Sequence, residues 1–589
     1  MTVYIIAAVC AAMLRPVTVQ AAADVTAPAG RLVGLEQDVF GTTVHAFLGI
    51  PYAHPPVGDG RFRRAERLPP WDGVYNATTY PDMCIQASNL VAVGGEITQQ
   101  SEDCLYLSVW QPDPVPTRAA VMVWIHGGGF RTGSSAQYTG KYLTAAEGVI
   151  VVTVNYRVGP LGFLCTGTDD APGNMGLTDQ LLALQWVQDN IPSFGGDASR
   201  VTIFGHSAGA SSVGFHLLSP ASRNVFSRAI LQSGTAVLPG MLDTMSDATD
   251  KATGFSESLG CPTEHGATAL LTCLRSRDEQ QFATFTMFQP VVDNNFIPTN
   301  PSDALNHGMF KKADILIGTN PNEFVFFFSI LGIPGFSVGS ESTVDREQFL
   351  QTMNAGMIRV PELNALALEA VEFQYTDWLH PDKDTRYRDI LDAARGDYSF
   401  VCPAVTTARA HARHGAAVYM YRFAHRVTAS PWPDWVVATH GDELQFVFGL
   451  PTIPDVGYST EDAAVSHTVM RYWANFAKTG NPNNDSDNNF NGPVWSAFTE
   501  TDRAYMFLDG SGPRMMGGLK TTECALWDVY VPSLINKTDP QDPVTPEPAQ
   551  CQTTAEVSLP TVWGQSLTLA LFFSFIKDVL SFITAILAV

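Results

Sequence analysis

The sequence predicts an α/β fold in which a large, mostly parallel sheet is flanked by helices. Buried, β-branched runs at residues 120–125, 149–154 and 201–204 are typical of strands. The apolar residues of 179–190 recur at helical spacing between the second and third run. Continuously apolar strands that alternate with helices indicate a parallel sheet covered on both faces.

The strand pattern continues on either side of this region. Residues 24–75 read as strands and turns, and 225–231 as a strand or a helix-strand element. Further strands are expected at 314–318 and 417–422, and a surface helix at 466–479. We find no internal repeat.

Length and charge limit the classes of function. The 589 residues are 45% hydrophobic and 16% charged, which is a globular composition with a large core. The net charge of −23 argues against binding of nucleic acid, whose phosphates need a basic surface. No Gly/Ser-rich or charged linker interrupts residues 24–535, so we expect a single catalytic domain there.

The two ends of the chain differ from the rest. Residues 1–23 carry an apolar run that ends in three alanines, as in a secretory signal peptide, although a buried first strand is the alternative. Residues 536–565 form a Pro/Thr-rich linker, and the apolar tail at 566–589 holds the charged pair Lys577 and Asp578. The tail fits a GPI signal best, with a spanning helix or an amphipathic membrane or association helix as alternatives. We therefore expect a protein that is secreted or held on the outer face of the plasma membrane.

Sequons and cysteines agree with export. Glycosylation is expected at Asn76, Asn484 and Asn536. Of nine cysteines, Cys10 lies in the predicted signal, and the other eight lack zinc-site spacing. Disulfides are the expectation for an exported chain, but spacing alone does not assign the pairs.

The stretch Gly205-His206-Ser207-Ala208-Gly209 lies where the 201–204 strand passes into a helical pattern. A G-x-S-x-G sequence at a strand-to-helix turn is typical of a nucleophile elbow, which exposes the serine at the edge of the sheet. The amide after the serine, at the helix N-terminus, then faces a developing oxyanion. The alternative is a tight turn without chemistry.

Three glycines follow His126, directly after the 120–125 strand. Only glycine lets several backbone N–H groups converge on one oxygen, so the run predicts an oxyanion loop rather than a flexible one. A phosphate loop is disfavoured because no Gly-Lys-Ser/Thr follows.

A serine nucleophile needs a histidine base and a carboxylate that orients it, in the chain order Ser, Asp/Glu, His. Downstream of Ser207, His440 fits a late loop after a strand, and His425 fits less well. Glu323 follows the 314–318 strand, and Asp293 is the other candidate acid.

A second pair of histidines, His411 and His414, lies three residues apart on an expected helix. Because no third ligand is evident, a solvated helix face is favoured over a metal site. We expect no metal and no organic cofactor.

Together these motifs resemble the type-B carboxylesterase/cholinesterase family of α/β hydrolases, from about residue 34 to 530. The resemblance rests on further blocks, including FLGIPYA at 47–53, SEDCLYL at 101–107 and HGDEL at 440–444. The WPDW sequence at 432–435 is more like cholinesterases than other carboxylesterases.

The resemblance implies an α/β-hydrolase fold and an ester hydrolase that forms an acyl-enzyme. It makes Ser207 the nucleophile, His440 the base and then the acid, and Glu323 the orienting carboxylate. The oxyanion hole it implies is formed by the amides of three residues, Gly128, Gly129 and Ala208. It also implies three disulfides, Cys84–Cys104, Cys261–Cys273 and Cys402–Cys524. Ion pairs are implied between Arg157 and Asp179, and between Arg61 or Arg63 and Glu102.

Two cysteines, Cys165 and Cys551, are left unpaired by this assignment. Cys551 lies in the predicted linker, so it could join two subunits into a homodimer.

Departures from the family bear on the substrate. Residues 84–104 hold no Trp, Tyr or Phe where cholinesterases carry a Trp for the choline cation, and His206 replaces the usual Glu before the nucleophile. Candidate substrate-pocket residues are His206, Thr284, Thr286, Phe288, Phe326 and Phe327. We expect hydrolysis of neutral or varied small-molecule esters. The alternatives are a true cholinesterase and a non-catalytic cholinesterase-like adhesion protein.

Overall fold

The computed structural model describes residues 20–87, 99–284, 286–338, 343–354, 363–483 and 492–536, which belong to one compact unit.

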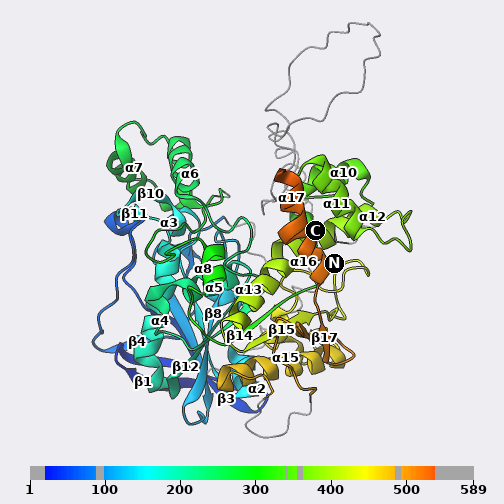
Figure 1. The fold of residues 1–589 in the computed structure, drawn as a ribbon. Helices are drawn as coiled ribbons and strands as arrows, with labels where there is room; N and C mark the ends of the chain where they lie inside the picture. Colours follow the sequence, from blue (N-terminus) through cyan, green and yellow to red (C-terminus); the bar gives the residue numbers. More distant parts are fainter. Residues whose placement is uncertain are drawn as a thin grey trace, which may run out of the picture. The chain divides into compact units, whose positions relative to one another are not determined.

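In this described part a 13-stranded sheet has the order β1-β2-β3-β7-β9-β8-β12-β13-β14-β15-β16-β17, with β4 beside β2 (Figure 1). Its strands are β1 (Gln20–Ala27), β2 (Gly30–Val39), β3 (Thr42–Pro51), β4 (Val74–Asn76), β7 (Tyr106–Asp113), β8 (Ala119–Ile125), β9 (Ile150–Val154), β12 (Gly196–His206), β13 (Arg228–Gln232), β14 (Ile315–Thr319), β15 (Val418–Phe423), β16 (Ala504–Leu508) and β17 (Arg514–Gly517). All neighbours from β9 to β16 are parallel. At the two ends of the order, β1, β2, β3, β7 and β17 pair antiparallel with their neighbours, and β4 alone pairs parallel with β2. The predicted mostly parallel sheet is confirmed.

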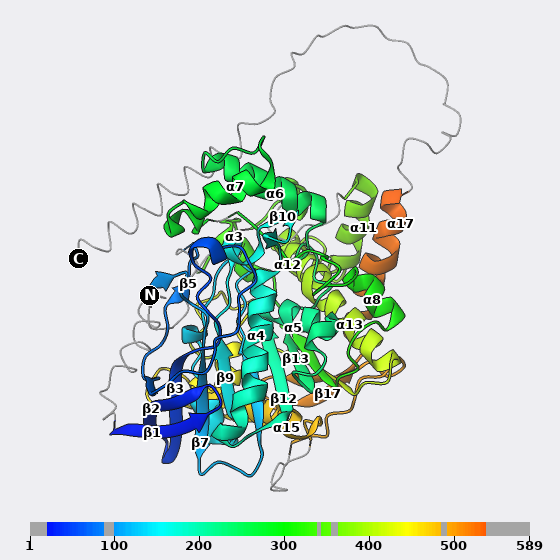
Figure 2. The same ribbon diagram turned by 90° about the vertical axis from the view of Figure 1, so that its left-hand side faces the viewer.

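Alternating side chains of each central strand enter two cores. In β8, Val121 and Val123 pack with α4 (Met175–Asn190), α5 (Ala208–Leu218) and α13 (Cys402–Arg413). Met122 and Trp124 point to the other face and pack with α2 (Lys141–Glu147) and α15 (Thr460–Thr479). Figure 2 shows α4 and α5 beside the central strands β12 and β13. Because both faces are covered, strands without a polar face are stable here.

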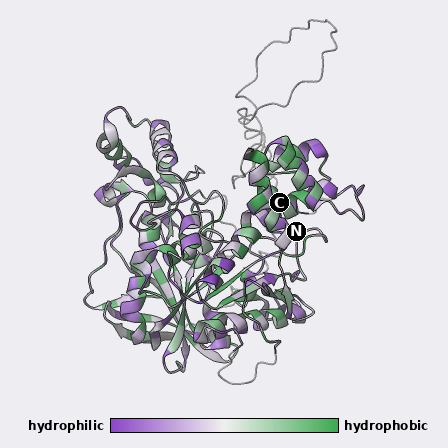
Figure 3. Ribbon diagram, viewed as in Figure 1, coloured by the Kyte–Doolittle hydropathy of each residue, from purple (hydrophilic) through white to green (hydrophobic). Residues whose placement is uncertain are grey.

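A third core forms among further helices and loops, and includes Phe130, Ala208 and Phe400. The helices of the described residues outside the two sheet faces are α3 (Gly159–Phe163), α6 (Met245–Ser258), α7 (Gly266–Arg275), α8 (Pro301–His307), α9 (Val325–Ile330), α10 (Arg346–Met353), α11 (Ala365–Tyr375), α12 (Arg386–Gly396), α16 (Thr521–Ala525) and α17 (Val531–Asn536). The short helix α14 (Leu444–Val447) packs with α2 and α15 in the second sheet-face core. Many helices carry both hydrophobic and hydrophilic residues along their length (Figure 3). The third core contributes Phe400 to the candidate site described below.

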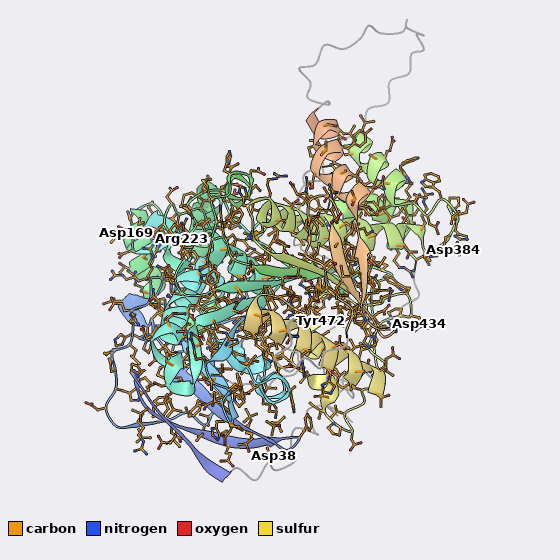
Figure 4. The ribbon with its side chains drawn as sticks, turned by 60° about the horizontal axis from the view of Figure 1, so that its bottom comes forward. Asp38, Asp169, Arg223, Asp384, Asp434 and Tyr472 are labelled. Atoms are coloured by element: carbon orange, nitrogen blue, oxygen red, sulfur yellow. A yellow bond between two sulfur atoms is a disulfide. The ribbon has the colours of Figure 1, made fainter. Side chains whose placement is uncertain are left out.

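Two helices are less exposed than the sequence suggested. The helix expected on the surface at 466–479 begins at Thr460 and buries Tyr472 and Trp473 against the sheet. Figure 4 labels Tyr472 on this helix. The solvated face expected for His411 is also wrong, since its ring is buried and stacks on Phe310 at 4.3 Å. Periodicity indicated that these segments are helical, but not how deeply tertiary contacts cover them.

The three implied disulfides are confirmed. They join Cys84 to Cys104, Cys261 to Cys273 and Cys402 to Cys524. Cys165 is a buried free thiol. The Arg157–Asp179 pair is present with 2.7 Å contacts, and Arg61 rather than Arg63 pairs with Glu102. Cys551 lies outside the described residues.

The predicted processing and glycosylation sites are described only in part. β1 begins at Gln20, so the predicted signal boundary after residue 23 falls inside this strand. Asn76 is exposed at the end of β4, Asn536 ends α17, and Asn484 lies outside the described residues, as does the tail at 566–589. Within the described ranges, no helix combines the length and the apolar character needed to cross a bilayer.

Candidate active site

Ser207 occupies a sharp turn between β12 and α5. Its backbone has φ 58° and ψ −125°, a strained combination for a residue with a Cβ. The flanking glycines make the turn possible: a Cβ at Gly209 would lie 2.1 Å from the carbonyl oxygen of Ile125. One at Gly205 would lie 2.6 Å from the carbonyl of Gly209. The motif therefore adopts the geometry of a nucleophile elbow.

Hydrogen bonds to neighbouring elements hold this turn in place. The Ser207 amide donates to the carbonyl of Gln232 at the end of β13, at 2.9 Å. The Ser207 carbonyl accepts from the Ser211 amide at 2.9 Å as α5 begins. The backbone around the serine is thus fixed on both sides, which strained turns require.

Glu323 and His440 meet although 117 residues separate them. Glu323 lies just beyond β14, and an isolated bridge from Asn322 to Thr439 brings the two loops together. His440 Nδ1 lies 2.7 Å from Glu323 Oε2. Glu323 Oε1 accepts hydrogen bonds, both 2.6 Å long, from the Asn320 amide and the Ser233 hydroxyl.

Burial sets the protonation of this pair. Removal from water lowers the pKa of His440, so the imidazole is neutral and able to accept a proton near pH 7. Burial raises the pKa of Glu323, and the bonds from Asn320 and Ser233 oppose that rise. His440 Nε2 makes no hydrogen bond with any described residue, which leaves it available as a base.

The glycine loop after β8 lies against the elbow. A Cβ at Gly127 would approach the Ser207 Cβ to 3.1 Å. Gly128 and Gly129 have φ values of 112° and 63°, which L side chains rarely adopt. Among the described residues, the amides of Gly128, Gly129 and Ala208 have no backbone partner, so these N–H groups are candidate oxyanion donors.

Aromatic rings surround His440. The ring centroid of Phe327 lies 4.9 Å away and that of Phe326 6.4 Å away, so both predicted pocket residues are at the site. Phe400 is as close, at 4.6 Å, and was not among the pocket residues predicted from the sequence. It comes from a helical segment before α13 that carries no motif of its own.

Three of the other predicted pocket residues, Thr284, Thr286 and Phe288, have their described contacts with residues other than Ser207 and His440. Thr284 and Thr286 bond to each other through their hydroxyls at 3.1 Å. Phe288 is buried edge-on against Phe255. No hydrogen bond or ring contact of the described residues joins these three to Ser207 or His440, so their role in the pocket stays a prediction. His206, in contrast, contacts His440 with ring centroids 4.3 Å apart.

The alternative base and acid are engaged elsewhere. His425 Nε2 lies 2.7 Å from Asp462 Oδ1. One Asp293 oxygen accepts the amides of Asn295 and Ile297 and so shapes a loop. In the described ranges, no three or more His, Cys, Asp or Glu residues are placed to hold a metal.

Comparison with known proteins shows the family of the chain. The chain belongs to the carboxylesterase family, whose model, described as "Carboxylesterase family", matches residues 21–527. It is therefore an α/β-hydrolase and a carboxylic ester hydrolase. It is 41% identical over 536 residues to a protein described as Cholinesterase from Mus musculus, covering 87% of this chain and 88% of that protein.

Proposed function

We propose that the enzyme hydrolyses small carboxylic esters through an acyl-enzyme on Ser207. The observation that carries this proposal is the 2.7 Å bond from His440 Nδ1 to Glu323. The other ring nitrogen, Nε2, has no hydrogen-bond partner in the described structure. The Nδ1–H donates to the carboxylate, so the lone pair of Nε2 can take the Ser207 proton.

The reaction then follows from these positions. Ser207 Oγ attacks the ester carbonyl while His440 accepts its proton, and the amides of Gly128, Gly129 and Ala208 donate to the oxyanion. The C–O bond to the alcohol breaks as His440 returns the proton to the leaving oxygen. His440 then takes a proton from a water molecule, whose oxygen attacks the acyl carbonyl. The bond from that carbon to Ser207 Oγ breaks as His440 gives the proton to Oγ, and the acid is released. The protein groups that act in these steps are the side chains of Ser207, His440 and Glu323 and three backbone amides.

We propose that the substrates are neutral or varied esters rather than choline esters in particular. Burial, and then the neighbouring His440, lower the pKa of His206 to about 3, so an uncharged ring precedes the nucleophile. Residues 84–104 also lack an aromatic side chain that could hold a quaternary ammonium. The alternative, a true cholinesterase, is favoured by the likeness to the mouse Cholinesterase.

Matched esters separate these two proposals. We expect kcat/KM for acetylcholine to stay within about tenfold of that for its neutral isostere, because a desolvated cation–π contact alone contributes about 2 kcal/mol and none is expected here. The measurement is the ratio of kcat/KM for the two esters at pH 7.5. A preference above a hundredfold for the cation would establish the cholinesterase alternative.

We further propose export, with attachment through a GPI signal in residues 566–589 and homodimer formation through Cys551. The signal-like start, the three sequons and the small residues before the apolar tail support this. A phosphatidylinositol-specific phospholipase is expected to release the esterase from cell membranes. Activity that stays with the membrane would reject the anchor, and a dimer band of Cys551→Ser on a non-reducing gel would reject the disulfide.

A further inference from the structure

A second acid–imidazole pair adjoins the candidate site. His206 Nε2 is 4.0 Å from Glu443 Oε1, and the His206 ring contacts the His440 ring at 4.3 Å. Both side chains of this second pair are more than nine-tenths buried, and His206 Nε2 has no hydrogen-bond partner among the described residues. Two imidazoles in contact cannot both carry a proton charge without strong repulsion, so the state of one limits the other.

The surroundings of Glu443 suit a carboxylate. Oε1 accepts from Gln232 Nε2 at 3.1 Å, and Oε2 accepts from Asn320 Nδ2 at 2.7 Å. Trp473 Nε1, which can only donate, bonds to Gln232 Oε1 and thereby fixes the direction of that amide. Asn320 Nδ2 is likewise fixed by the Thr439 carbonyl. Glu443 therefore receives donors from both sides and presents its Oε1 to His206.

We propose that His206 acts through His440 by being uncharged: its ring, held between Glu443 and His440, occupies the place of a carboxylate that would stabilise the His440 imidazolium, and ester hydrolysis thereby extends to lower pH. The inference rests on the proposed Ser207–His440 chemistry. A carboxylate at position 206, as the family resemblance leads one to expect, would instead stabilise the His440 imidazolium.

The other titratable groups nearby do not reverse this effect. Burial raises the pKa of Asp442 to about 7, and this carboxyl accepts the Thr439 amide; it is present in every variant compared, so its titration does not alter the difference between their midpoints. Glu323 faces His440 at Nδ1, and its oxygens are bonded to His440, Asn320 and Ser233. Burial and the charge of Glu443 both raise the pKa of Tyr138 and of Tyr421, so the two phenols stay neutral. Glu443 is the group that favours a charged His206, and burial together with His440 outweighs it.

The test is the pH dependence of kcat/KM for a neutral ester between pH 4.5 and 8. The wild-type acid limb is expected below pH 6.5. In His206→Glu its midpoint should rise by about one unit, because an opposite charge at this distance shifts a pKa by about one to three units. His206→Gln, which adds no charge, should leave the midpoint within about 0.3 unit. His380→Gln, at an exposed histidine paired with Asp377, is the control for loss of an imidazole.

Two outcomes would overturn the proposal. One is an equal shift in His206→Gln and His206→Glu, which would indicate loss of packing rather than of charge. The other is the absence of a shift both in His206→Glu and in the double variant His206→Glu/Glu443→Gln. The double variant is included because the new carboxylate has no Glu443 carboxylate with which to share a proton. If the variants do not fold, a wild-type midpoint at or above pH 6.5 overturns it by itself. Organophosphate labelling of Ser207 at pH 7.5 reports on the proposed chemistry independently of these midpoints.

Discussion

Replacing Ser207 by alanine is expected to lower kcat for ester hydrolysis by about 10⁴-fold or more, because no other group in the proposed mechanism can form the acyl-enzyme. The fold should be retained, since alanine keeps the Cβ that the turn at φ 58° already accommodates. Initial rates with a chromogenic ester, alongside the thermal unfolding midpoint, measure both effects.

Ser211→Ala is the matched control for this change. Ser211 lies one turn further along α5, is buried, and its hydroxyl has no hydrogen-bond partner in the described structure. Its removal should leave kcat within about twofold, because no interaction is lost. A Ser207→Ala protein that is folded and still hydrolyses esters at the rate of the Ser211→Ala protein would contradict the proposed nucleophile.

The second large effect is expected for Glu323→Gln, which should lower kcat by about 10³- to 10⁴-fold. Asn320 N–H donates to Oε1, so the glutamine carbonyl oxygen is drawn to that position. The amide NH₂ then faces His440 Nδ1, which becomes an acceptor, and the proton moves to Nε2. A protonated Nε2 cannot take the Ser207 proton.

Asp293→Asn separates this effect from a general loss of negative charge. Asp293 is the other acid that chain order allows, and its oxygen accepts two loop amides. The asparagine oxygen can accept the same bonds, so kcat should change by less than about threefold. The assigned role of Glu323 would be contradicted by comparable losses of kcat in both variants. It would also be contradicted by a Glu323→Gln protein whose kcat on the pH plateau equals that of the wild type. Stopped assays across pH 5–9 provide the measurement.

The sequence predicted the sheet and the elbow because both depend on local patterns. Apolar runs such as 120–125 become buried strands wherever helices cover both faces. The glycines around Ser207 are required by contacts within the turn itself and to the adjacent strand, so the motif carries its own geometry. Pairing of the cysteines, by contrast, came only from the family resemblance.

The partners of the serine were harder to predict from the residues alone. Chain order left His425 beside His440 and Asp293 beside Glu323, and only tertiary contacts separate them. The bridge between Asn322 and Thr439 joins loops that carry the acid and the base. No periodicity in either loop indicates that contact.

The supporting residues were missed for the same reason. No sequence motif marks the strand end that holds Gln232 and Ser233 or the helical segment that holds Phe400. These residues contact Glu443, Glu323 and His440 only because the fold brings β13, β14 and the helical segment before α13 together. Glu443 lies inside the HGDEL block that the resemblance rests on, three residues after His440. That carboxylate and the unusual His206 were the signals in the sequence that could have pointed to the second pair.

The central claim is that Ser207, activated by His440 and Glu323, forms the covalent intermediate. The most direct measurement is labelling of the full chain with an organophosphate ester, followed by mass spectrometry of the peptide that contains Ser207. The account predicts one label per chain, on Ser207, with loss of esterase activity in proportion, and no label in folded His440→Ala. Full inactivation with the label on any other residue, or an active, folded enzyme whose Ser207 stays unmodified, would contradict it.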